Sequence, residues 1–308
     1  MKRRDFIKKT LGAGMAAGSA FTIGGVGQLF ASNTSESNLA YDLVAIKGGE
    51  PDTMFNKGMN VLGGISNYVK KGQKVVIKPN IGWDAIPERA ANTNPKLISH
   101  IVKSCIQAGA KDVYVFDNTC DTWTRCYKNS GIETAVKNAG GKIVPGNSEK
   151  YYQEVAVPKG KRLRSTKIHE LILESDVFIN VPVLKHHSST NLSIAMKNLM
   201  GIVWDRRYWH RNALHQCIAD FSTYRKPDLN IIDAYRVMMK NGPRGVSNAD
   251  VKVYKYMVIS PDIVAADSAA AKIFGSQPEN ISHIKIANDM NVGEMDLENL
   301  NISRIKLS

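Results

Sequence analysis

The sequence has 308 residues, of which 43% are hydrophobic and 22% are charged. These proportions are those of an ordinary globular protein with enough length for a large core, and they exclude a disordered or fibrous chain. The net charge is +13, four units of which lie in residues 1–31. The charge favours anionic partners, and we expect no nucleic acid among them, because no long basic run or zinc-finger spacing occurs.

The N-terminal segment has the features of an export signal. Arg3 and Arg4 are followed by an uncharged, glycine-rich stretch from Leu11 to Ser32, which ends in small residues. This order resembles a twin-arginine signal peptide over residues 1–32, with a polar linker at 33–39. The resemblance implies a periplasmic protein exported by the twin-arginine machinery, a route whose passengers fold before export, often around a cofactor. An uncleaved membrane anchor is the alternative, and we expect membrane contact only through this segment.

Residues 40–308 alternate between strand-like and helix-like patterns. We predict strands at 41–47, 74–78, 112–117, 142–144, 176–183, 228–234, 253–260 and 300–307, and helices at 53–69, 95–108, 130–139, 212–224, 261–274 and 278–288. The polar stretch 146–166 predicts an excursion such as a hairpin. Repeated strand–loop–helix units are typical of parallel crossovers. The fold class is therefore predicted to be α/β, a mostly parallel sheet with helices on both faces, as one domain or two intimately packed lobes.

The densest group of polar residues follows the predicted strand at 176–183. Lys185, His186 and His187 come in succession, and Lys197 and Asn198 follow them closely. In an open parallel sheet, ligands bind outside the carboxyl ends of the strands. Either lysine could hold a carboxylate or phosphate, or act as a base or Schiff-base nucleophile if it were desolvated. If the segment is extended, His186 and His187 point opposite ways, so only one should face the site.

Other predicted strand ends also carry polar residues. We expect the loops 78–84, 117–126, 184–198 and 233–245 to form one cleft. The ligand-binding candidates are Lys78, Asn80, Asp117, Asn198, Asp233, Gly242 and Arg244. The alternatives are an edge lysine for Lys78 and caps of the next element for Asp117 and Asp233. Asp267, on a predicted alanine-rich helix, has a capping or buried ion-pair role as its alternative to a site role.

The cysteines and one aromatic–basic segment leave further alternatives open. Cys120 and Cys126 lie in one loop, where an exported protein could form a disulfide; metal ligation is the less favoured interpretation. Cys105 and Cys217 fit core positions. The segment 204–211 interleaves aromatic and basic residues. It is interpreted as a lid over an anionic substrate or as an exposed amphipathic connection.

Six sequence motifs occur together in order. They are KPN at 78–80, NVPVLKHH at 180–187, MKNLMG at 196–201, LNIIDA at 229–234, NGPRG at 241–245 and SPDIVAADSAAAKIFG at 260–275. Over most of residues 41–290 they resemble the domain-of-unknown-function 362 (DUF362) family. Members of that family are often fused to ferredoxin-type modules. The four cysteines here lack a C-x-x-C-x-x-C run, so we expect no ferredoxin-type iron–sulfur cluster.

A more distant likeness is to the N-terminal region of nickel-pincer lactate racemases, in the order of KPN, TNPKL, the strand before KHH, and MKNLMG. That resemblance implies a nickel-type or other metal cofactor, held by an Asp-containing loop, histidines and a lysine. The identity of any cofactor stays open, because likeness of fold does not carry function.

These observations favour an enzyme that acts on a small anionic substrate, such as a hydroxy acid or a sugar acid. The expected catalytic residues are Lys185, one of His186 and His187, and Lys197. A racemase, an epimerase or a redox enzyme whose cofactor is inserted before export fits best. The alternatives are a non-catalytic periplasmic protein that binds a ligand or cofactor, and a metal-dependent hydrolase.

Overall fold

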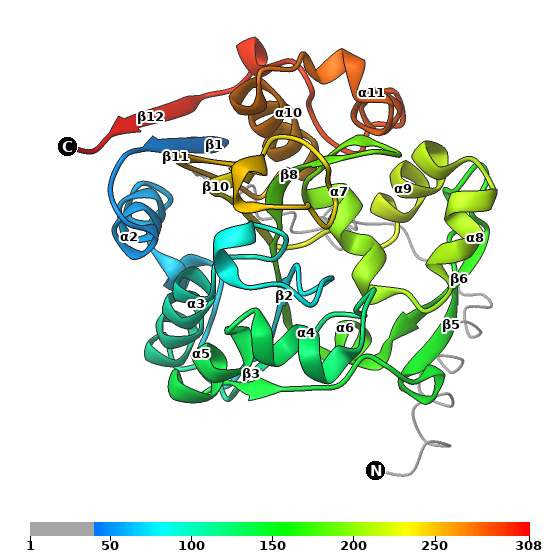
Figure 1. Cartoon of the computed structure of the whole chain (residues 1–308), viewed down its shortest axis with the longest axis horizontal. Helices are drawn as coiled ribbons and strands as arrows, with labels where there is room; N and C mark the ends of the chain where they lie inside the picture. The colour runs from blue at the N-terminus through cyan, green and yellow to red at the C-terminus, as the bar shows by residue number, and fades with distance from the viewer. Residues whose placement is uncertain (1–39) are drawn as a thin grey trace, which may run out of the picture. The chain divides into compact units, whose positions relative to one another are not determined.

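One large sheet organises the part of the chain that the computed structural model describes, residues 40–308 (Figure 1). The predicted signal peptide and linker lie outside these residues. The sheet strands are β1 (Leu43–Lys47), β2 (Lys74–Pro79), β3 (Asp112–Val115), β4 (Lys142–Ile143), β7 (Val177–Val181), β8 (Val183–His187), β9 (Asn191–Ser193), β10 (Leu229–Met238), β11 (Val251–Ser260) and β12 (Ile302–Lys306). Residues 40–308 belong to one compact unit.

The strand order is β12-β1-β11-β10-β7-β2-β3-β4, with β8 paired to β10 and to β9. The neighbours from β10 through β7, β2 and β3 to β4 are parallel, as is the pair of β1 and β12. Strand β11 is antiparallel to both β1 and β10, and β9 is antiparallel to β8. The predicted α/β class with a mostly parallel sheet is therefore confirmed.

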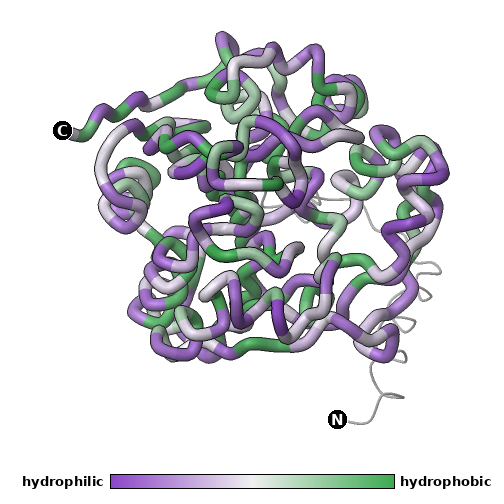
Figure 2. Tube along the Cα trace, in the orientation of Figure 1, coloured by the Kyte–Doolittle hydropathy of each residue, from purple (hydrophilic) through white to green (hydrophobic). Residues whose placement is uncertain are grey.

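Helices cover both faces of the sheet (Figure 1). One face packs against α2 (Pro51–Val61), α3 (Pro95–Gln107), α4 (Trp123–Asn129) and α5 (Ile132–Asn138). The other packs against α6 (Glu170–Glu174), α7 (Ala195–Asn198), α8 (Arg206–Arg211), α9 (Leu214–Ser222), α10 (Ile263–Phe274) and α11 (Ser282–Asp289). The alternation of strand side chains divides the core: Val76 faces the second group of helices, whereas Val75 and Ile77 face the first. Figure 2 shows the hydrophobic residues along the inner strands and the inward sides of the helices.

The polar stretch 146–166 leads into a hairpin of β5 (Tyr152–Ala156) and β6 (Ser165–His169), which form a separate antiparallel pair. The predicted hairpin is thus confirmed. The start of α3 is also as predicted, with Pro95 in the first turn and the Asn94 side chain accepting a hydrogen bond from the Lys96 N–H.

Three local features differ from the predicted elements. The helix predicted at 53–69 begins at Pro51 and ends at Val61, before Gly63 and Gly64. The helix α4 was not predicted. The strand predicted at 228–234 continues further as β10, which follows its pairing with β11 as far as Met238.

The strand predicted at 176–183 differs in a way that matters for the site. Pro182 interrupts it, because proline lacks the N–H that a ladder requires. The chain resumes as β8, which runs through Lys185, His186 and His187 and pairs with β9. These three residues therefore lie on a strand and not in a loop.

Candidate functional site

A cavity of about 320 Å³ lies where the carboxyl ends of β2 and β3 meet β8 and α7. Its lining includes Lys78, Asn80, Asp117, Lys185, Lys197 and Asn198, all of which the sequence singled out. They converge because parallel strands bring their carboxyl ends to one edge of a sheet. Asp117 is the only carboxylate among the lining residues, whereas three lysines and two arginines line the same space. The cavity is therefore strongly cationic.

The floor of the cavity contains a buried ion pair. The Lys78 Nζ lies 2.9 Å from the Asp117 Oδ1, and the side chains are 1% and 3% exposed. Asp117 Oδ2 accepts a hydrogen bond from the Ile81 N–H at 2.7 Å. Burial lowers the pKa of Lys78, and the charge of Asp117 opposes that shift. Gly201 leaves room for the pair, since a Cβ there would lie 1.9 Å from Asp117 Oδ1 and 2.6 Å from Lys78 Nζ.

Asparagine side chains link this pair to the neighbouring strands. Asn198 Oδ1 accepts from Lys78 Nζ at 2.9 Å and from Asn80 Nδ2 at 3.1 Å. Asn198 Nδ2 donates to Asn180 Oδ1 at 2.8 Å, and Asn180 Nδ2 donates to Asn230 Oδ1 at 3.0 Å. Asn180 and Asn230 are fully buried on β7 and β10. The network holds each amide in one orientation, because each buried group has a partner. Sequence reasoning assigned no role to Asn180 and Asn230; an asparagine inside an apolar strand was the available signal.

Lys185 and Lys197 differ from Lys78 in having no carboxylate partner among residues 40–308. Lys185 is 1% exposed, and its Nζ donates to Asn80 Oδ1 at 3.2 Å and to the Ala91 carbonyl. Burial lowers the pKa of Lys185 to about 7 and the pKa of Lys197 to about 8. Near neutral pH, a substantial fraction of Lys185 and a smaller fraction of Lys197 therefore carry a free amine, whereas an exposed lysine is almost entirely protonated.

Only one of the two adjacent histidines lines the cavity. His187 Nδ1 accepts a hydrogen bond from the Ser189 N–H at 3.0 Å, which leaves the proton of the neutral ring on Nε2. Burial and the nearby lysines hold the pKa of His187 at about 2, so its ring is neutral. His186 Nδ1 accepts from the Gly242 N–H at 3.1 Å, outside the cavity.

The aromatic–basic segment 204–211 supplies one wall. It contains α8, from which Arg206, Arg207 and His210 line the cavity. The Arg206 guanidinium donates to the carbonyls of Asn118 and Thr119 and so fixes α8 to the loop after β3. Burial lowers the pKa of His210, with Lys197 as the next cause. These three side chains were predicted only as members of a lid segment, and none was named as a site residue.

Three predicted ligand-binding residues do not line the cavity. Asp233 lies inside β10, which continues beyond it, and its carboxylate accepts from the Asn94 and Tyr235 N–H groups at 2.7 and 3.1 Å. Gly242 packs against the His186 carbonyl, from which an added Cβ would be only 1.8 Å away. Arg244 is exposed and pairs with Asp121 at 3.5 Å. Their positions indicate structural roles around the site, within β10 for Asp233 and in the loop after β10 for Gly242 and Arg244.

The cysteines and the potential metal ligands show whether the site contains a disulfide or a metal centre. All four cysteines are free, so Cys120 and Cys126 form no disulfide here; Cys120 is exposed and lines the cavity, whereas Cys126 is buried. Within residues 40–308, no three His, Cys, Asp or Glu side chains converge as metal ligands. Of the two histidines that line the cavity, His187 accepts a hydrogen bond at Nδ1 and carries its proton on Nε2. The cavity side chains therefore suit an anion and do not form a protein-ligated metal centre.

Three comparisons show which known proteins the chain is similar to. A family described as Domain of unknown function (DUF362) matches residues 75–272. This range includes the Lys78–Asp117 ion pair and the two other cavity lysines, Lys185 and Lys197. The thylakoid-associated protein sll1697 of Synechocystis sp. is 25% identical over 228 residues, covering 71% of this chain and 68% of that protein. The lactate racemase apoprotein from Thermoanaerobacterium thermosaccharolyticum superposes with a TM-score of 0.44 at 12% identity, over 80% of this chain and 56% of that one.

Proposed function

The chain belongs to the DUF362 family, and from the geometry of its cavity we propose that it is an enzyme that moves a proton on a small carboxylate-bearing anion. The observation that carries this proposal is the position of Lys185 and Lys197. Two lysines with pKa values near neutrality line one cationic cavity, and neither has a carboxylate partner in residues 40–308. Perturbed lysines in a cavity are typical of catalytic bases and anion sites.

Anion binding comes first in the proposed mechanism. Lys197, which is mostly protonated at neutral pH, and the two arginines of α8 attract a carboxylate into the cavity. The volume of about 320 Å³ accommodates a small hydroxy acid or sugar acid. The Lys78–Asp117 pair and Asn198 keep the floor fixed, so little reorganisation accompanies binding.

Proton transfer then uses the free amine of Lys185. Its Nζ takes the proton from the carbon next to the carboxylate, and the electron pair of the broken C–H bond moves onto the carboxylate to give an enediolate. Lys197 and the arginines stabilise the added negative charge. Return of the proton from Lys185 to the same face restores the substrate, whereas delivery of a proton to the opposite face by the ammonium group of Lys197 inverts the carbon, so the reaction class is racemisation or epimerisation. The neutral His187 ring offers an N–H donor at the cavity wall.

The proposal is tested by solvent exchange. The protein is incubated in D₂O with D- and L-lactate, glycerate and a set of sugar acids, and NMR follows deuterium at the carbon next to the carboxylate. We expect exchange with the native protein and with Lys57→Met, an exposed lysine on α2, and none with Lys185→Met. Lys197→Met should weaken binding in calorimetry. Binding without exchange would identify a ligand-binding protein instead, and an absence of binding across the set would remove the proposal altogether.

We also propose that the protein is exported through the twin-arginine route, which rests on the Arg3–Arg4 pair and the uncharged stretch behind it. None of the helices described in residues 40–308 is both long and apolar enough to cross a membrane. Fractionation of cells that express the native chain or the Arg3→Lys/Arg4→Lys variant tests the route. The native chain should appear in the periplasmic fraction, and the variant should stay in the cytoplasm. Recovery of both in the cytoplasm would contradict export, and recovery of both in the periplasm would contradict the twin-arginine route.

A further inference from the structure

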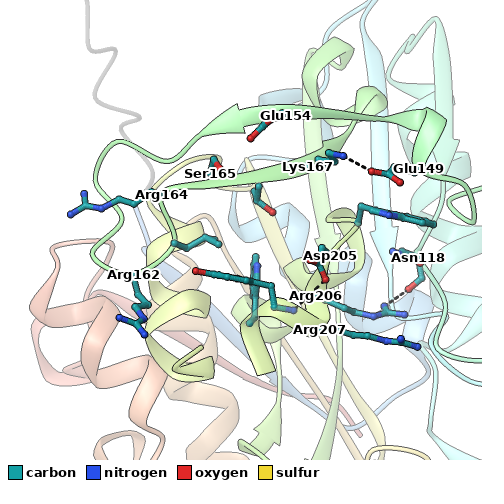
Figure 3. Close-up of a pocket in the computed structure, with 15 residues that line it drawn as sticks. Asn118, Glu149, Glu154, Arg162, Arg164, Ser165, Lys167, Asp205, Arg206 and Arg207 are labelled. Carbon is teal, nitrogen blue, oxygen red and sulfur yellow. Dashed lines mark hydrogen bonds and ion pairs between the residues drawn. The ribbon is translucent and has the colours of Figure 1, made fainter. Parts of the chain in front are cut away.

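The wall that α8 adds to the cavity of about 320 Å³, which we call the substrate cavity, carries two arginines. Arg206 and Arg207 line it together with His210, which follows them by four and three residues, the spacing of neighbours on one helix face. Both arginines also border a larger cavity beside the β5–β6 hairpin, drawn in Figure 3. In that view their side chains extend in the same direction, away from Arg162 and Arg164 of the hairpin.

The charges of these two guanidinium groups are not neutralised by a carboxylate of the protein. Neither Arg206 nor Arg207 forms an ion pair among residues 40–308. Arg206 is held by the carbonyls of Asn118 and Thr119, which are uncharged. The adjacent carboxylate of Asp205 accepts a hydrogen bond from the backbone of α8 and does not line the substrate cavity. Both arginines therefore keep their full charge for a ligand.

The substrate cavity holds more unpaired positive charge than one carboxylate requires. The ion pair of the floor is neutral, and Lys185 is the proposed base. Lys197, Arg206 and Arg207 remain, and Arg206 lies close enough to Lys197 for its charge to lower the pKa of that amine. Lactate would bring one negative charge, and its enediolate two. A hydroxy acid with a second anionic group brings two, and its enediolate three, which matches the three cations.

We infer that the substrate is a hydroxy acid with a second anionic group, a carboxylate or a phosphate, and that Arg207 selects for this group. The inference rests on the proposed function, because it leaves the reacting carboxylate to Lys197. The second group lies against the guanidinium groups of Arg206 and Arg207, which can hold either oxyanion through paired hydrogen bonds. Arg206 is fixed by its two carbonyl partners, whereas the exposed Arg207 side chain has all its donors available among residues 40–308.

Matched ligands test the second charge. Malate differs from lactate by one carboxylate, and 3-phosphoglycerate differs from glycerate by one phosphoryl group. The 4-amide of malate keeps the shape of malate without its second charge. In calorimetry with the full chain, we expect malate or 3-phosphoglycerate to bind at least about tenfold more tightly than its monoanionic partner, the effect of one charge-assisted hydrogen bond. The malate amide should bind as lactate does. Equal affinity for all five ligands would overturn the inference.

Variants of α8 test the role of Arg207. In Arg207→Met, the ratio of the malate or 3-phosphoglycerate affinity to that of its monoanionic partner should fall about tenfold, and Arg207→Lys should restore part of it. Arg211→Met removes an exposed guanidinium from the same helix outside both cavities, so it should change neither the ratio nor the exchange rate. An unchanged ratio in Arg207→Met would overturn the assignment of Arg207. Circular dichroism confirms that each variant is folded before the comparison.

The second anionic group and the proton transfer can fail separately. Deuterium exchange of lactate and malate at equal rates, with equal affinities, would overturn the second group and leave proton transfer intact. A preference for malate or 3-phosphoglycerate that Arg207→Met abolishes, without exchange of any ligand, would support the second group and overturn proton transfer. Calorimetry therefore decides this inference, and solvent exchange decides the proposed reaction.

Discussion

The Lys78 Nζ lies 2.9 Å from the Asp117 Oδ1, and this pair is buried beneath the cavity that we assign to the substrate. Removing one member of a buried pair leaves an uncompensated charge and typically costs about 3–5 kcal/mol. The pair also fixes Asn198, which accepts from the same Nζ at 2.9 Å. It thereby joins β2, the loop after β3, and α7 into one rigid floor.

Gly201→Ala tests how closely the backbone must approach this pair. The added methyl group would collide with Asp117 Oδ1 and Lys78 Nζ. We expect the free energy of unfolding, measured in urea, to fall by about 3 kcal/mol, at the upper end of overpacking costs. Gly82→Ala is the matched control, because its Cβ would lie 3.4 Å from the nearest atom in the same cavity. Equal stability of the two variants would contradict the predicted collision.

Lys185→Met should change how stability depends on pH. The pKa of Lys185 is lowered from 10.5 to about 7 by folding. Between these values the unfolded chain holds a proton that the folded chain has released, so this residue makes native stability rise with pH by up to about 1.4 kcal/mol per unit. The variant should therefore be more stable than the native protein near pH 6, with an advantage that shrinks toward pH 10. Urea unfolding at several pH values measures this, and a less stable variant at pH 6 would count against the buried amine.

The rate of solvent exchange should follow a bell-shaped pH profile. Lys185 must lose its proton to act as a base, so kcat/KM should rise through about pH 7. Lys197 must keep its proton to attract the anion, so kcat/KM should fall above about pH 8. In Lys197→Met the alkaline limb should disappear, whereas Lys57→Met should retain it. A profile without an acidic limb in the native protein would exclude Lys185 as the base.

Cys120 provides a chemical probe of the cavity entrance. It is exposed and lines the cavity, whereas Cys105, Cys126 and Cys217 are buried. Iodoacetamide should therefore modify Cys120 alone in the folded protein, as followed by mass spectrometry. A bound carboxylate should slow that modification several-fold. Modification of all four thiols at similar rates would show that the reagent reaches the core as easily as the cavity, which would contradict the burial of Cys105, Cys126 and Cys217. The Cys120→Ser variant identifies the labelled peptide.

Asp267→Ala tests the support of α7. The Asp267 carboxylate accepts from the Ala195 and Met196 N–H groups at 2.6 and 3.1 Å, at the start of the helix that carries Lys197. Loss of these two hydrogen bonds should reduce the free energy of unfolding by about 2–3 kcal/mol and weaken anion binding. Asp289→Ala, which removes an exposed carboxylate from α11, should change neither quantity.

Much of the site could be predicted because it follows from sheet topology. Lys78, Asp117 and Lys185 come from separate parts of the sequence, and a parallel sheet brings them to one edge. The capping alternative considered for Asp267 is also the role that the structure shows. Neither result required knowledge of side-chain conformations.

The remaining features depend on packing that sequence patterns do not encode. His186 and His187 point to opposite sides because the chain after Pro182 is extended as β8. The pairing of β8 with β9 keeps this segment extended, and the sequence pattern did not predict that pairing. Asp233 resembled a strand-end ligand because the extension of β10 was not foreseen. Arg206 lines the cavity because the segment after Gly201 packs against the loop that follows β3. The hydrogen bonds from Arg206 to the carbonyls of Asn118 and Thr119 show this packing, and no sequence pattern predicts it.

Titration of the lysine side chains themselves tests whether Lys185 and Lys197 have the lowered pKa values on which the proposed function depends. Protein labelled with ¹³C at the lysine Cε atoms is followed by NMR as pH is raised, and Lys185→Arg and Lys197→Arg assign the two signals by their disappearance. We predict midpoints near pH 7 for Lys185 and near pH 8 for Lys197, and an upward shift of both when a small carboxylate binds. Midpoints at the ordinary value of 10.5 for both lysines, unchanged by any carboxylate, would contradict the proposed function.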